Sequence, residues 1–249
     1  MKKVLQLCVL VAFVLISIHA TCGPKKPLIK DPVQVVKFRD EVYFHNMSIA
    51  FDGDYYYTIN GGNDAYCMIN QYDMDGELID EYDVELDGRA IFFNPADEEF
   101  YIKIYGGDLY KVDLNVETTE LVHEGIFKDD QSSPGMTPDG KYLYEYYEDR
   151  IRVLDFKTGK KVKGYKFEPG FNESGYYASL ACSDYYLFAW GATDEIVVYD
   201  LDGNYITEID LPRDGYGFSL SYCNGLLWIA RDADGSTEGD TGYWYGYRL

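Results

Sequence analysis

One stretch near the C-terminus, residues 232–240, alternates carboxylates with small residues. Calcium prefers several hard oxygen ligands, and Asp232, Asp234, Glu238 and Asp240 would supply them. The spacing departs from an EF-hand loop, because Ser236 stands at its fifth position and Tyr243 at its twelfth. The sequence therefore predicts either a calcium site or a solvated acidic loop here, and no other cofactor.

Aromatic side chains and one arginine lie in neighbouring stretches between predicted strands. These candidate ligand-binding residues are Tyr176, Tyr177, Arg213, Tyr216 and Trp244. Aromatic rings beside Asp and Asn suit stacking on a sugar or gripping a protein, and an arginine can clamp a carboxylate. The alternative is structural, since strands favour tyrosine and this chain contains 26 of them.

Residues arranged for catalysis are few. His45 and His123 are the only histidines beyond the N-terminal segment, and no G-x-S-x-G, phosphate-loop or HExxH motif is present. Cys67, Cys182 and Cys223 form no CxxC or Cys/His pair, which predicts small buried side chains rather than a zinc site. Adjacent acids such as Asp129-Asp130 could serve a glycosidase, but 43 acidic residues make adjacency uninformative.

The charge balance narrows the possible partners. The chain has 249 residues, with 43 acids against 22 Lys and Arg, and a net charge of −21. Nucleic acids and anionic membrane surfaces would repel such a protein. A hydrophobic content of 47% excludes a disordered acidic tail. We therefore expect a protein or glycan partner.

The N-terminus is typical of an export signal. Lys2 and Lys3 precede an apolar run from Val4 to Ile18, so residues 1–21 are interpreted as a signal peptide. Cleavage could follow Ala20, or Cys22 could be the lipidated first residue of a bacterial lipoprotein, with residues 22–32 as a tether. The mature protein is expected to be extracytoplasmic, secreted or periplasmic, and any membrane attachment would depend on a lipid at Cys22.

The rest of the chain, residues 33–249, repeats with a period near 43. A turn followed by an aromatic strand begins at Phe51, Asn94, Pro138, Cys182 and Cys223, with spacings of 43, 44, 44 and 41. A second strand–turn–strand unit follows each of the first four at constant phase. Each period therefore predicts four strands, which is the content of one propeller blade.

The fifth period lacks its last strand. Its final piece, Tyr243 to Leu249, corresponds to a third strand, and Val33 to Phe38 could supply the fourth from the other end of the chain. This arrangement would close the ring and remove two exposed edges. We predict an all-β protein with one β-propeller of five four-stranded blades, with six as the alternative.

The third period resembles a known group of repeats. The segment Pro138-Asp139-Gly140-Lys141-Tyr142-Leu143-Tyr144, followed by Val153-Leu154-Asp155 and a turn, is similar to repeats of bacterial YVTN/TolB-like β-propellers. Such relatives commonly have six or seven blades, whereas five periods are counted here. The resemblance implies a fold and no particular activity.

These observations favour a non-catalytic binding or scaffold module of the bacterial envelope. In a propeller, the loops from second to third strands and those between blades share one face, which would gather the candidate residues. The alternative is a propeller enzyme, either a metal-dependent lyase or lactonase or a carboxylate glycosidase.

Overall fold

The computed structural model describes residues 26–40, 45–62, 67–166, 179–191, 195–212, 215–232 and 242–249. The predicted signal peptide, Cys22 and the start of the tether lie outside these ranges. Within them every regular element is a β-strand. No helix able to span a membrane occurs in the described ranges.

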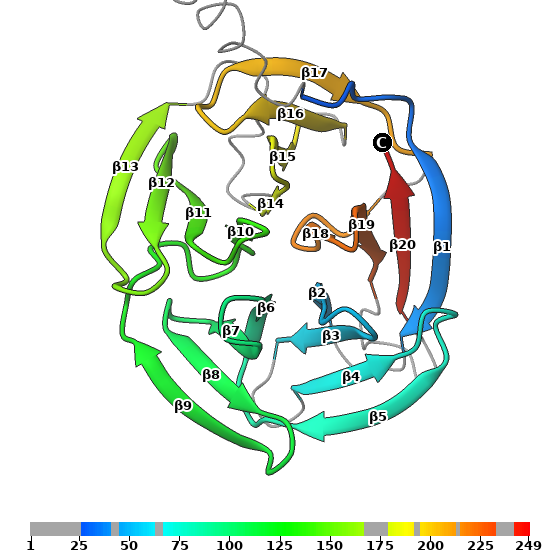
Figure 1. The fold of residues 1–249 in the computed structure, drawn as a ribbon, viewed down its shortest axis with the longest axis vertical. Coiled ribbons are helices and arrows are strands. Elements are labelled where there is room, and N and C mark those ends of the chain that lie inside the picture. Colours follow the sequence, from blue (N-terminus) through cyan, green and yellow to red (C-terminus); the bar gives the residue numbers. More distant parts are fainter. Residues whose placement is uncertain are drawn as a thin grey trace, which may run out of the picture.

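Twenty strands form five antiparallel four-stranded sheets arranged around a centre (Figure 1). Blade 1 contains β2 (His45–Phe51), β3 (Tyr56–Gly61), β4 (Met68–Tyr72) and β5 (Leu78–Asp83). Blade 2 contains β6 (Gly88–Asn94), β7 (Glu99–Ile104), β8 (Leu109–Asp113) and β9 (Thr118–His123). Blade 3 contains β10 (Gly135–Met136), β11 (Tyr142–Tyr147), β12 (Arg150–Asp155) and β13 (Lys161–Lys166). Blade 4 contains β14 (Leu180–Cys182), β15 (Tyr186–Trp190), β16 (Ile196–Asp200) and β17 (Tyr205–Ile209). Blade 5 contains β18 (Ser221–Cys223), β19 (Leu226–Arg231), β20 (Gly242–Arg248) and β1 (Val33–Asp40).

The first strand of each of blades 1–4 lies nearest the centre, and the fourth lies at the periphery (Figure 1). Burial follows this order. The inner strand β2 is almost entirely buried, whereas the peripheral strand β5 is almost entirely exposed. The five-bladed propeller predicted from the repeat is confirmed.

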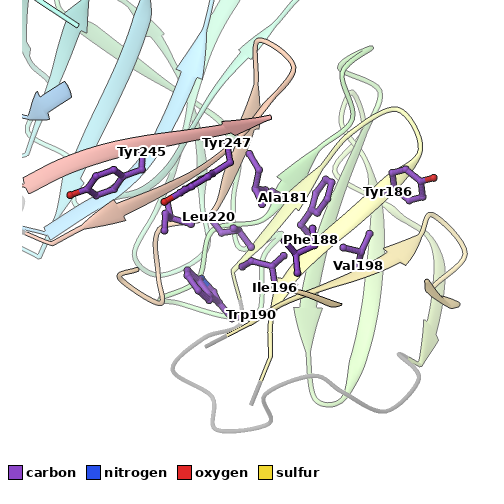
Figure 2. Packing of buried hydrophobic residues seen from close by; sticks show 12 residues of the cluster. Ala181, Tyr186, Phe188, Trp190, Ile196, Val198, Leu220, Tyr245 and Tyr247 are labelled. Atoms are coloured by element: carbon purple, nitrogen blue, oxygen red, sulfur yellow. The ribbon is translucent and has the colours of Figure 1, made fainter. Parts of the chain in front are cut away.

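Hydrophobic contacts between neighbouring blades make up the core. Figure 2 shows the cluster between blades 4 and 5, in which Phe188 and Trp190 of β15 lie near Leu220 and Tyr247. Comparable clusters join blades 1 and 2, blades 3 and 4, blades 5 and 1, and blades 2 and 3. Since each apolar sheet face packs on its neighbour, the blades depend on one another for stability.

The N-terminal strand closes the ring, as predicted. β1 pairs antiparallel with β20 from Val33 opposite Arg248 to Asp40 opposite Gly242, so the strand runs two residues beyond Phe38. At this seam, Gly76 of blade 1 has a φ of 84°, and an added Cβ would lie 2.2 Å from Cβ of Phe38. Glycine is therefore required there both by conformation and by space.

Candidate functional site

The two ends of the propeller differ in their connections. The end with loops from second to third strands and from blade to blade is called the loop face. The opposite end, with the turns between first and second strands and between third and fourth strands, is called the turn face. Among the described residues, Tyr216 and Asp232 of the predicted site lie in connections of the loop face.

Six predicted site residues lie outside the described residues: Tyr176, Tyr177, Arg213, Asp234, Glu238 and Asp240. Tyr216, Asp232 and Trp244 are described. The calcium site therefore stays a prediction. No group of three metal-ligating side chains occurs within the described part of the chain.

Trp244 lies inside blade 5 rather than at a rim. Its side chain is fully buried, and its indole Nε1 donates a hydrogen bond of 2.6 Å to Oδ2 of Asp40. A ligand has no access to this ring, so Trp244 is not carried into the candidate site below.

Asp232 binds a histidine from the neighbouring blade. Its Oδ2 lies 2.6 Å from Nδ1 of His45, and its Oδ1 accepts a hydrogen bond of 3.1 Å from the backbone N–H of Asn46. The carboxylate thus orients the imidazole and joins the end of β19 to the start of β2. About a third of the His45 side chain is exposed, which leaves it accessible at the loop face.

Tyr216 lies against this pair. Its ring stacks on the His45 ring at a centroid distance of 5.2 Å and meets Phe218 edge-on at 5.3 Å. Burial raises the pKa of Tyr216, the Asp232 carboxylate adds to the rise, and Arg89 opposes it. The Tyr216 hydroxyl is therefore neutral and lies in the electric field of both charged groups.

Arg89 extends the cluster into blade 2. Its Nη2 donates a hydrogen bond of 2.8 Å to Oδ2 of Asp87, and its guanidinium lies 5.3 Å from the centroid of the half-exposed Tyr105 ring. The second oxygen of Asp87 accepts a hydrogen bond from the N–H of Gly62. Nε of Arg89 is buried and has no hydrogen-bond partner among the described residues. The guanidinium therefore lies between the carboxylate of Asp87 and the ring of Tyr105.

His45, Tyr216, Asp232, Arg89, Asp87 and Tyr105 are called the loop-face cluster. They come from blades 5, 1 and 2 and combine aromatic rings with charges of both signs. Tyr216 and Asp232 are predicted site residues, whereas His45 and Arg89 are not among the residues that the sequence predicted. An arginine followed by the apolar run Ala90–Phe93 was the available signal for Arg89.

A second buried polar group lies between blades 2 and 3. The fully buried Lys103 donates to the backbone carbonyls of Asp130 and Ser132, at 2.8 and 3.1 Å. Burial lowers the pKa of Lys103 to about 8, although Asp129 and Glu145 act in the opposite direction. Burial likewise raises the pKa of Glu145, which accepts hydrogen bonds from Arg152 and from the backbone of the same loop. These contacts fasten the loop that links the two blades.

The centre of the ring holds a cavity of about 410 Å³ between the five inner strands. It reaches the turns after β2, β6, β10, β14 and β18, and so opens at the turn face. The structure thus contains two candidate sites, the loop-face cluster and this cavity, at opposite ends of the propeller.

The sequence matches no known protein family, and no curated protein is recognisably similar to it. Among solved structures, the fold is similar to that of the glutaminyl cyclase of Myxococcus xanthus, with a TM-score of 0.61 and 10% sequence identity. The match covers 90% of this chain and 98% of the other. At this identity the likeness establishes the propeller fold alone.

Proposed function

We propose that this protein is an exported bacterial propeller that binds a protein or glycan at its loop face without transforming it. The loop-face cluster supports this proposal most directly. The rings of Tyr216 and Tyr105 supply area for stacking on a sugar or an aromatic side chain. The exposed part of the His45 imidazole supplies a directional hydrogen-bonding group.

The proposed location rests on the N-terminal sequence. Its Lys-Lys pair and apolar run favour export, and the resemblance of the third blade to YVTN/TolB-like repeats favours a bacterial envelope protein. The described chain begins at the turn face, where Tyr186 donates a hydrogen bond of 2.5 Å to the carbonyl of Pro27 and Lys26 pairs with Asp200. A lipid at Cys22 would therefore hold the turn face toward the membrane and leave the loop face open to partners.

The alternative, a propeller enzyme, is favoured by two observations. The fold is similar to that of a glutaminyl cyclase, and a carboxylate that orients a partly exposed imidazole is an acid–base arrangement. A metal-dependent lyase or lactonase would need further ligands, and a glycosidase would need a second carboxylate across the site. Within the described residues no group of three metal-ligating side chains occurs. The second carboxylate of the cluster, Asp87, is already bonded to Arg89 and to the N–H of Gly62.

Binding would be tested by screening the protein from Lys26 onward against glycan and peptide arrays, and then by measuring affinity for the strongest binder. Tyr216→Ala should weaken that affinity about tenfold or more. Tyr205→Ala is the matched control, since Tyr205 is an exposed tyrosine on the peripheral strand β17. Equal affinity of the Tyr216 variant and the wild type would exclude the loop face.

The enzyme alternative is tested with the same binder as substrate. Under the proposed function its mass and concentration stay unchanged on prolonged incubation. Turnover that disappears in His45→Ala and in Asp232→Ala, while the Tyr205 control keeps it, would establish the enzyme instead.

A further inference from the structure

The cavity at the turn face is formed by all five blades. Its inner part is lined by buried residues of the inner strands, including Ser48, Leu180 and Leu220. Its open end is lined by exposed turn residues, among them Asp184 and Asn224. The volume of about 410 Å³ lies within the range of small-molecule sites.

Aromatic side chains from three blades line this cavity. Phe51 of blade 1, Phe93 of blade 2 and Tyr222 of blade 5 are only partly buried, although they lie on the inner strands or at their ends. A further ring holds each one in place. The distances between ring centroids are 4.9 Å from Phe51 to Tyr56 and 5.2 Å from Phe93 to Phe100. Tyr222 stacks on Phe188 with a centroid distance of 5.6 Å. The lining rings are therefore pre-positioned before any ligand arrives.

The described residues of the lining carry charge of one sign. They include the carboxylates Asp52 and Asp184, and no lysine or arginine is among them. Asp52 is committed to its own turn, because it accepts hydrogen bonds from the N–H groups of Asp54 and Tyr55 and from the Tyr57 hydroxyl. Asp184 accepts no hydrogen bond from the described residues, and its carboxylate reinforces the rise that burial causes in the pKa of Tyr222.

We propose that this cavity binds a small organic cation, an ammonium group carried on an apolar body, between the rings of Phe51, Phe93 and Tyr222 and the carboxylate of Asp184. The electron-rich faces of aromatic rings attract an ammonium group, and the attraction is stronger in a site that excludes water. The apolar body fills the space beside Met136 and Ile49. The net charge of −21 raises the local concentration of cations and repels anions.

This site is separate from the loop-face cluster and does not depend on the proposed function. The two lie at opposite ends of the ring, and the lining of the cavity shares no residue with the cluster. Variants at one site should therefore leave binding at the other unchanged.

The test compares three probes of similar size by isothermal titration calorimetry: benzyltrimethylammonium, benzyl alcohol and benzoate. The cation should bind at one site, about tenfold more tightly than the neutral alcohol, and benzoate should not bind. Equal affinity for the alcohol would reduce the site to an apolar cavity and overturn the proposal. No saturation by the cation at about 10 mM would also overturn it.

Variants at Asp184 and Tyr222 identify the groups that bind the cation. Asp184→Asn lies in an exposed turn, where substitution should leave the fold intact, and should weaken cation binding about three- to tenfold. The control Asp202→Asn removes an exposed carboxylate from another turn of the same blade, outside the lining, and should leave the affinity unchanged. Tyr222→Phe keeps the ring and should retain binding, whereas Tyr222→Leu should lose it. Unchanged affinity in Asp184→Asn, or equal loss in the control, would contradict the assignment.

Tyr216→Ala tests whether the cavity and the loop-face cluster bind independently of each other. It should bind benzyltrimethylammonium as the wild type does, whatever the outcome of the array screen. A failure of the proposed loop-face binding can then be distinguished from a failure of the proposed cation site.

Discussion

Oδ2 of Asp40, the last residue of β1, accepts a hydrogen bond of 2.6 Å from Nε1 of Trp244 on β20. The same carboxylate accepts hydrogen bonds from four side chains of blade 1: Tyr72, Asn46, Thr58 and Asn70. Asp40 is fully buried, and burial raises its pKa, while the hydrogen bonds from Tyr72, Trp244, Asn46 and Thr58 act against the rise. One carboxylate therefore joins the last blade of the ring to the first.

Replacing Asp40 should destabilise the closed ring strongly. In Asp40→Ala the five donors lose their shared acceptor inside the protein, which should cost about 3–5 kcal/mol of unfolding free energy. Urea denaturation followed by tryptophan fluorescence measures this loss. The control Glu77→Gln, an exposed acid on blade 1, should change the unfolding free energy by less than about 0.5 kcal/mol. A loss below about 1 kcal/mol in Asp40→Ala would show that water replaces the carboxylate.

The apolar part of the seam gives a second prediction. Phe38 is 5% exposed. The centroid of its ring lies 4.7 Å from that of Tyr72 and 5.9 Å from that of Trp228. Phe38→Ala should cost about 3–5 kcal/mol, because it leaves a cavity between blades 5 and 1. Val33→Ala, at a position 60% exposed on the same strand, should cost less than about 1 kcal/mol. Similar thermal denaturation midpoints for the two variants would mean that the strand contributes only main-chain pairing.

The buried Lys103 should raise the unfolding free energy of the protein at alkaline pH. Burial lowers its pKa from 10.5 to about 8, so between these values the unfolded chain binds more protons than the folded one. The contribution of Lys103 to the unfolding free energy should therefore increase from pH 8 toward pH 10, by about 3 kcal/mol at most.

Lys103→Met isolates this contribution, because other titrating groups affect both proteins equally. The difference in unfolding free energy between wild type and Lys103→Met should shift in favour of the wild type as pH rises from 7 to 10. A difference that stays constant over this range would show that Lys103 keeps an ordinary pKa.

The proposed anchor is tested by fractionation in a bacterial host. If Cys22 is lipidated, Cys22→Ser should move the protein from the membrane to the soluble fraction, since one cysteine carries the lipid. Cys67→Ser, at a buried cysteine of the propeller, should leave the distribution unchanged. Unchanged fractionation of Cys22→Ser would favour cleavage after Ala20.

Much of the architecture follows from local sequence. Asp-Gly turns and aromatic strands recur at constant phase, so the number of strands in each blade could be counted without a structure. The truncated fifth period even predicted the closing strand, because an unpaired third strand needs a partner and only one extended segment remained. These are short-range signals, repeated five times.

Which side chains meet at the ends of the ring depended on tertiary structure. His45 and Asp232 are 187 positions apart and come together only because blade 5 closes against blade 1. Trp244 was expected at the rim, yet the register of β20 directs its indole to the buried Asp40. Side chains alternate between the two faces of a strand, and which face points inward is known only when the neighbouring strands are known. The cavity likewise arises from the spacing of five inner strands, since its volume is set by how the blades pack rather than by any one of them.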